Sequence, residues 1–316
     1  MTNPPISLAT RIALSRTVWI CVAILLLAST LPLYVSGYIL GLLTIAYYFG
    51  VFSMAWDLLF GFAGEVNFGP TFLIGLGAYT AGILDNLYQP PIWLCLAAGA
   101  FAAVAGGVVL ALPALRVRGP YFGLTTLVAV LMLQNFIVVA ASLTGGEIGL
   151  TVPDVISISD SVNYWIALGF MAFSGAVLYA LSHSPVGLIL QASGQDAVQA
   201  GALGFNVTKH KLAAFIISAL FSGLAGALMV FYLGAASVGT FVDVTVGVQV
   251  IIGAVLGGRR TILGSVLGAL FLIAMGETLR PLGDLATFIV SAMALVVVLL
   301  FPAGLLGLLT RTQEGG

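Results

Sequence analysis

The residues that could carry chemistry are few, and several of them gather in one polar interval, residues 182–211. The chain of 316 residues has only 21 Lys, Arg, Asp and Glu residues and two histidines. The interval contains His183, Asp196, Lys209, His210 and Lys211. Neither histidine has a thiol or carboxylate close by in the sequence, as acid–base or nucleophilic catalysis would require. The interval therefore has the character of a surface that faces a soluble partner.

The motifs of an enzyme are missing from the chain. We find no phosphate-binding loop, no His/Cys/Asp/Glu cluster with metal-ligand spacing and no Ser/His/Asp constellation. Cys21 and Cys95 both lie in apolar runs, where an isolated thiol serves as a small packing residue. We therefore expect a chain that is not an enzyme, binds no metal or cofactor, and has no energy source of its own.

The elements that position the polar interval are membrane helices. Hydrophobic residues make up 61% of the chain and charged residues 7%, against roughly 25% charged in soluble domains. Apolar runs of about 20 residues recur, each long enough to cross a bilayer as a helix. They lack the period-two alternation of a membrane barrel. The sequence thus predicts an all-α, polytopic transmembrane helical bundle.

Ten spans are predicted, in a single membrane domain over residues 1–316. The predicted spans cover residues 17–34, 38–60, 67–84, 92–112, 121–143, 162–181, 212–234, 244–256, 262–278 and 285–306, with a tail at 307–316. Ten crossings place nine of the ten Lys and Arg residues on one side, where both termini also lie; only Arg280 falls opposite. Basic residues concentrate in cytoplasmic loops, so this side and the interval 182–211 are expected to be cytoplasmic.

Ionisable groups at membrane depth are costly, so each one suggests a functional site. Glu65 and Asn67 belong to residues 61–70, where three glycines and a proline predict a helix break. Such a break could line a cavity within the membrane, or it could be an ordinary cytoplasmic turn. Asp57 could reach the interface from the end of its span. Glu277 stands three residues before Arg280, a spacing that predicts an ion pair.

Small residues are abundant and indicate close helix packing. Gly264 and Gly268 are spaced four apart, which lets two helices approach closely. The span over residues 244–256 is short and could be a half-helix of the kind that borders a translocation path.

Five blocks, in order along the chain, resemble one protein family. They are GFAGEVNFGPTFLIGLGAYTAG (61–82), RVRGPYFGLTTLV (116–128), TGGEIGL (144–150), the segment over residues 184–228, and GAVLGGRRTILGSVLGALFL (253–272). The chain resembles the LivM-type permease subunits of ABC importers for branched-chain amino acids. This resemblance implies a permease of the bacterial cytoplasmic (inner) membrane that pairs with a second permease subunit, commonly a different chain. It also implies two ATP-binding subunits, which hold the ATP and Mg, and a periplasmic binding protein that delivers the substrate.

The resemblance also implies which residues matter. A cytoplasmic coupling helix, roughly residues 194–203, would dock on the ATPase and end near Gly204. The coupling residues would be Gly194, Gln195, Asp196, Ala197, Ala200, Leu203, Gly204 and Asn206. The residues that could line the translocation path would be Glu65, Asn67, Phe68, Gly69, Gly77 and Tyr79.

The chain departs from the family pattern at several positions. Relatives often carry several charges in the coupling segment, where Asp196 is the only one here. Arg260 and Ser265 replace a usual glycine and proline, and Asn67 stands where serine is common. We therefore expect the coupling segment to dock by shape more than by charge.

Other functions stay open at this stage. A related importer could carry urea or short amides in place of Leu, Ile or Val. An ion-coupled secondary transporter would need buried acids, for which Glu65 is the one candidate. An integral-membrane enzyme would need a catalytic set that the sequence lacks.

Overall fold

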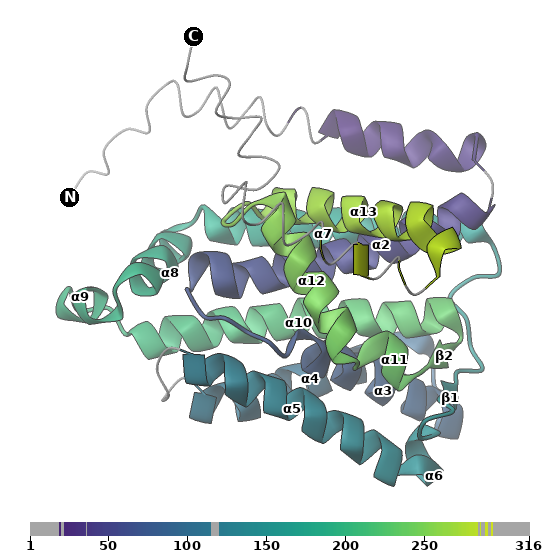
Figure 1. Ribbon diagram of the computed structural model, residues 1–316, viewed down its shortest axis with the longest axis horizontal. Helices are drawn as coiled ribbons and strands as arrows, with labels where there is room; N and C mark the ends of the chain where they lie inside the picture. Colours follow the sequence, from purple (N-terminus) through teal and green to yellow (C-terminus); the bar gives the residue numbers. More distant parts are fainter. Residues whose placement is uncertain are drawn as a thin grey trace.

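The computed structural model describes residues 19, 22–35, 37–114 and 120–283, with 285, 288, 289 and 292 beyond them. Within this part the chain is a bundle of apolar helices, most of which lie along one direction (Figure 1). The main helices are α2 (Gly37–Asp57), α3 (Pro70–Tyr88), α4 (Ile92–Ala114), α5 (Pro120–Val139), α7 (Asp160–Ser182), α10 (Val207–Leu233), α12 (Val244–Gly257) and α13 (Ile262–Leu279). The shorter ones are α6 (Ala141–Thr144), α8 (Pro185–Gln195), α9 (Ala197–Ala202) and α11 (Val238–Phe241).

Seven helical segments of the described chain are long and apolar enough to cross a membrane. They contain α2 with its π-helical extension Leu58–Phe62, α4, α5, α7, α10, α11 with α12, and α13. The prediction of a polytopic helical membrane protein is confirmed, and the count of ten spans agrees only roughly. Helix α3 forms over 19 residues but is less apolar, and the first predicted span appears as a shorter apolar helix, Val22–Leu33. Most of the tenth predicted span lies outside the described residues.

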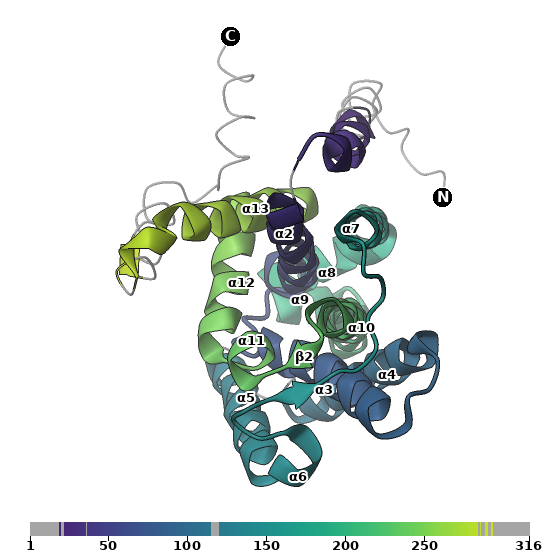
Figure 2. The ribbon, with the colours of Figure 1, turned by 90° about the vertical axis from the view of Figure 1, so that its right-hand side faces the viewer.

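Among the seven candidate spans, those of α2 and α10 are the most buried, and these two helices form the centre of the bundle. Helix α10 packs against α2, α3 and α4, while α2 also contacts α7, α12 and α13. Figure 2 looks along the bundle and shows α10 with α3 and α4 on one side and α2 on the other. Both central helices lack a polar face, as expected of helices surrounded by apolar partners.

Small residues let three of these helices approach to backbone contact. A Cβ on Gly77 of α3 would collide with the backbone of Gly223 on α10, and one on Gly99 of α4 would lie 2.6 Å from the Gly77 carbonyl oxygen. Gly257 of α12 and Gly264 of α13 meet in the same way. The glycine-rich stretches of the sequence are therefore mainly packing surfaces, as predicted.

The two ends of the bundle differ in their charge. At one end, Arg260 contacts the last turns of α2 and Lys211 contacts the segment that follows α2. We call this the basic end; it also carries α8 and α9, at the left of Figure 1. At the other end, Arg280 bonds to Tyr38 at the start of α2. That opposite end holds a short antiparallel pairing of β1 (Leu150–Thr151) with β2 (Ala235–Ala236), in which Leu150 faces Ala236.

The predicted placement of the basic residues on one side of the membrane can be checked for part of the chain. Lys211 and Arg260 lie at the basic end and Arg280 at the opposite end, as the span count predicted. The roughly 39 Å length of a 26-residue helix, α2 with its extension, separates these groups. Arg259 is described as well and stacks over Phe60, whereas Arg11, Arg16, Arg116, Arg118 and Arg311 lie outside the described residues.

Candidate coupling site and translocation path

The predicted coupling helix is two helices joined at Asp196. Helix α8 ends at Gln195, and Asp196 has an extended backbone, with φ −148° and ψ 102°. Its carboxylate accepts the N–H groups of Val198 and Gln199, at 2.9 and 3.0 Å, and so caps α9. The expectation of one helix over residues 194–203 was therefore wrong in its bounds. An aspartate that caps a new helix cannot also continue the preceding one.

Helix α9 ends just before Gly204, as the sequence predicts. Gly204 has φ +90°, a left-handed conformation that suits the residue after a helix C-terminus. Asn206 then caps α10 by accepting the Lys209 N–H at 3.0 Å. The chain between two long membrane helices is thus fixed by local capping bonds at Asp196 and Asn206.

The outer surface of α9 is uncharged and carries exposed apolar side chains next to Gln199. Val198 and Leu203 are 70% and 74% exposed, while Ala200 between them is buried against the bundle. The Asp196 carboxylate is engaged in capping α9, and α9 itself contains no charged residue. This surface therefore suits a partner groove that recognises shape and apolar groups.

The coupling segment touches the segment that follows α2. Gly64, with φ +72°, lies so close to Gly194 that a Cβ on it would stand 2.7 Å from the Gly194 Cα and carbonyl oxygen. A Cβ on Gly194 would likewise stand 2.7 Å from the carbonyl oxygen of Phe62. Backbone therefore lies against backbone here, with no side chain in between.

An ion pair joins the same segment to α10. Lys211 Nζ donates to Glu65 Oε1 at 2.6 Å, and the two side chains are only 12% and 18% exposed. Glu65 was predicted as a path residue; the structure places it at the basic end, in contact with α10. Its partner Lys211 lies 146 residues later in the chain, so spacing alone could not have identified the pair.

Residues 63–69 form the predicted break. The chain leaves α2 through the π-helical turn, then runs back from the basic end toward the middle of the bundle, where α3 begins at Pro70 (Figure 1). Trp56 Nε1 of α2 donates to the Asn67 carbonyl oxygen at 2.6 Å. The Phe68 N–H donates to Thr126 Oγ1 of α5 at 3.0 Å.

The chain thus turns back beside α2 as irregular backbone before it resumes as a helix. Irregular backbone of this kind is stable in a membrane protein where protein buries it and supplies its hydrogen bonds. This geometry matches the helix-break alternative for residues 61–70 more closely than a simple turn between two helices.

The other candidate path residues divide into two environments. Asn67 is buried and its Oδ1 accepts the Gly69 N–H at 2.8 Å, whereas Phe68 is 43% exposed. Gly77 is buried in the contact between α3 and α10. Tyr79 is buried, and its hydroxyl has no hydrogen-bond partner. Their role in translocation stays a prediction.

A second cluster ties α2 to the turn between α12 and α13. The Arg260 N–H donates to Asp57 Oδ1 at 3.2 Å, and Arg260 Nε donates to the Gly61 carbonyl oxygen at 2.9 Å. Arg259 stacks over Phe60, with its Cζ 4.7 Å from the ring centroid. Arg260 has φ +65°, a left-handed conformation. This explains why glycine would suit the position; the bonds to α2 hold arginine there instead.

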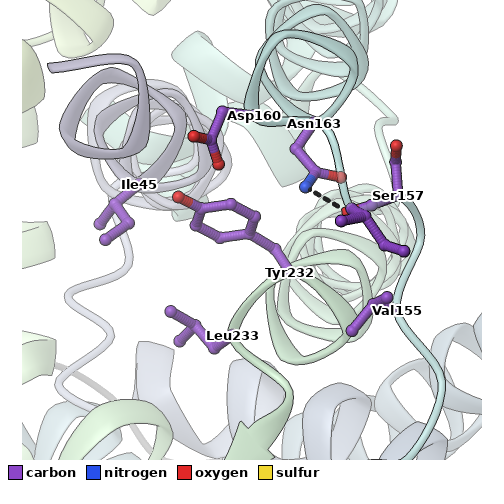
Figure 3. A pocket seen from close by; sticks show the side chains of 8 residues that line it. Ile45, Val155, Ser157, Asp160, Asn163, Tyr232 and Leu233 are labelled. Carbon is purple, nitrogen blue, oxygen red and sulfur yellow. Dashed lines mark hydrogen bonds between the residues drawn. The ribbon is translucent and has the colours of Figure 1, made fainter. Parts of the chain in front are cut away.

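The opposite end has an open, surface-exposed cavity of about 480 Å³ between α2, α7 and α10 (Figure 3). It is lined by Ile45, Val155, Ser157, Ile158, Asp160, Asn163, Tyr232 and Leu233. Its polar groups include the Asp160 carboxylate and the Tyr232 hydroxyl, and none of the eight residues is basic. A cavity with one carboxylate and several apolar walls could accept the ammonium group of a small amphipathic molecule.

The histidines make local hydrogen bonds. His183 Nδ1 bonds to the Tyr179 carbonyl oxygen at 2.9 Å, and His210 Nδ1 bonds to that of Asn206 at 2.8 Å. In the part of the chain that the structure describes, no group of His, Cys, Asp and Glu residues could hold a metal ion.

Comparison with known proteins decides the family. A family profile described as "Branched-chain amino acid transport system / permease component" matches residues 38–302, most of the chain. The chain belongs to this permease family. No solved structure matches it significantly.

The permease is similar to named transport proteins. It is 27% identical to the high-affinity branched-chain amino acid transport system permease protein LivM of Escherichia coli K12, over 92% of this chain and 75% of that protein. It is 25% identical to LivH of Salmonella typhimurium, over 82% of this chain and 91% of LivH. It is 24% identical to BraD of Pseudomonas aeruginosa, over 84% and 93% of the two chains.

The sequence left two features of the permease unrecognised. The first is the pairing of Glu65 with Lys211 and of Asp57 with Arg260, which joins segments far apart in the chain. The predicted topology placed these groups near one side of the membrane, and that was the available signal. The second is the cavity around Asp160, whose apolar lining residues look in sequence like any other membrane residues.

Proposed function

We propose that this permease forms the translocation path of an ATP-driven importer for branched-chain amino acids. ATP, with Mg, would be hydrolysed on two separate ATP-binding subunits, because the sequence of the permease contains no phosphate-binding loop. A binding protein on the outer side would deliver the substrate. The observation that carries this proposal is α9, an exposed and uncharged helix between two long membrane helices of a chain in this permease family.

The orientation follows from charge. Lys209, Lys211, Arg259 and Arg260 gather at one end, and basic residues favour the cytoplasmic side. The basic end would therefore face the cytoplasm of a bacterial inner membrane, with α9 available to an ATPase. The cavity around Asp160 would then face the binding protein.

The substrate is inferred from the names of the relatives together with the chemistry of the cavity. LivM, LivH and BraD are each named for branched-chain amino acid transport. Asp160 could pair with a substrate ammonium while Ile45, Val155 and Leu233 contact an apolar side chain. Urea and short amides carry no ammonium group, so this cavity favours them less.

The importer would contain a second permease subunit. Both LivM and LivH resemble this chain, which supports a pair of related but different permeases. The outer faces of α5 and α13 carry exposed large apolar residues such as Met132, Phe136 and Phe271, which lipid or a second subunit could cover.

Affinity purification from a native membrane tests the partners. We expect the tagged permease to bring down a second permease and ATP-binding subunits. The binding protein that belongs to the same system should bind Leu, Ile or Val by calorimetry. Recovery of the permease alone, together with uptake that an ionophore abolishes, would favour an ion-coupled secondary transporter.

A further inference from the structure

We infer that residues 63–69 transmit a movement of α9 to the start of α3 within the membrane. The Glu65–Lys211 pair holds this segment to α10, the helix that follows α9. This inference rests on the proposed function, since it supposes that α9 is displaced by an ATPase. It assigns Glu65 and Lys211 as positioning residues for transport.

The first observation is that both flanks of α9 touch one short segment. Before α9, Gly194 lies in backbone contact with residues 62–64. After α9, Lys211 holds Glu65 at 2.6 Å. A displacement of α9 is therefore passed on to residues 62–65 from both of its ends.

The second observation is the rigidity of the contact at Gly194. No flexible side chain lies between the two backbones, because a Cβ on either glycine would stand 2.7 Å from backbone atoms of the other segment. Closely packed atoms transmit a shift instead of absorbing it. Gly64 and Gly194 allow the approach, and the ion pair prevents the segments from separating.

The third observation is where the segment leads. From Glu65 the chain passes Asn67, which Trp56 holds, and Phe68, which Thr126 holds, and enters α3 at Pro70. Residues 63–69 contain no helix or strand, but the bonds at Asn67 and Phe68 restrain them, so free bending does not absorb a shift at Glu65. A movement at Glu65 therefore reaches the start of α3, next to α5.

The experiment uses the complete transporter in liposomes and measures both ATP hydrolysis and amino acid uptake. Glu65→Gln and Lys211→Met each remove the pair. We expect ATP hydrolysis to continue while uptake falls, so that the ATP used per amino acid rises at least about fivefold, the lower end of typical coupling between sites. The charge-swapped double variant Glu65→Lys with Lys211→Glu should restore the wild-type ratio.

Lys209→Met is the matched control, because Lys209 is an exposed lysine on the same turn and makes no ion pair among the described residues. It should leave the ratio unchanged. An unchanged ratio in Glu65→Gln and Lys211→Met would overturn the inference. So would a parallel fall in uptake and hydrolysis, or failure of both variants to assemble, because either result would make the pair a structural brace only.

These outcomes are separate from the proposed function itself. If the wild-type transporter does not use ATP to import Leu, Ile or Val, the proposed function fails before any variant is compared. If the wild type does so and the variants keep its ratio, only the inference fails.

Discussion

Three acidic residues, Asp57, Glu65 and Glu277, are held by N–H or cationic groups at the ends of membrane helices. Glu277 pairs with Arg280 at 3.3 Å, and Tyr38 also bonds to both residues. This pair was predicted from its spacing of three and is confirmed. The partners of Asp57 and Glu65 come from distant segments, so only the folded chain reveals them. Because an unpaired charge in a membrane is costly, these contacts locate the positions at which the helices must meet.

At the residue scale, a substitution at Gly77 distinguishes a packing role from a role in the translocation path. Gly77→Ala should lower the free energy of unfolding of the purified permease by about 1–3 kcal/mol, and its melting temperature with it, because the added Cβ would overpack the contact with Gly223. Gly169→Ala on α7 is the control, since nothing lies within 4 Å of its Cβ. The control should be neutral or slightly stabilising. Equal melting temperatures, followed by reduced uptake in Gly77→Ala alone, would instead support the path assignment.

At the scale of elements, the glycine, proline and capping residues were the most informative parts of the sequence. Gly204 follows the end of α9 as expected, and the glycines and proline of residues 61–70 coincide with the break, although α3 begins at Pro70 and not at the predicted residue 67. The split between α8 and α9 was missed, although aspartate favours helix N-caps over helix interiors. The neighbouring contact of Gly194 with Gly64 joins segments 130 positions apart, so local sequence does not encode it.

Substitutions of Asp196 also distinguish docking on the ATPase by shape from docking by charge. Asp196→Ala should destabilise α9 by about 1 kcal/mol through loss of the cap. We expect it to reduce uptake by the complete transporter without affecting membrane insertion. Asp196→Asn keeps the capping oxygen and should retain most of the activity. Equal loss in both variants would show that the charge itself is recognised, contrary to docking by shape.

At the scale of the whole molecule, hydropathy predicted the class and most helix positions, because lipid imposes the same length and composition on every span. Helices α4, α7 and α13 begin and end within about two residues of their predicted bounds, within the usual uncertainty of helix boundaries. Helix α10 begins five residues earlier than the predicted span, at Val207 in place of Leu212, because Asn206 caps it in the polar interval. The lateral arrangement, with α2 and α10 central, depends on helix pairing and could not be read from hydropathy.

The most direct test of the proposed importer is uptake by proteoliposomes that contain the complete transporter, with binding protein outside and ATP inside. The proposal predicts that labelled leucine enters only when both ATP and the binding protein are present, and that collapsing ion gradients with an ionophore leaves this uptake unchanged. Leucine uptake that proceeds without ATP and stops when the ion gradient is collapsed would contradict it.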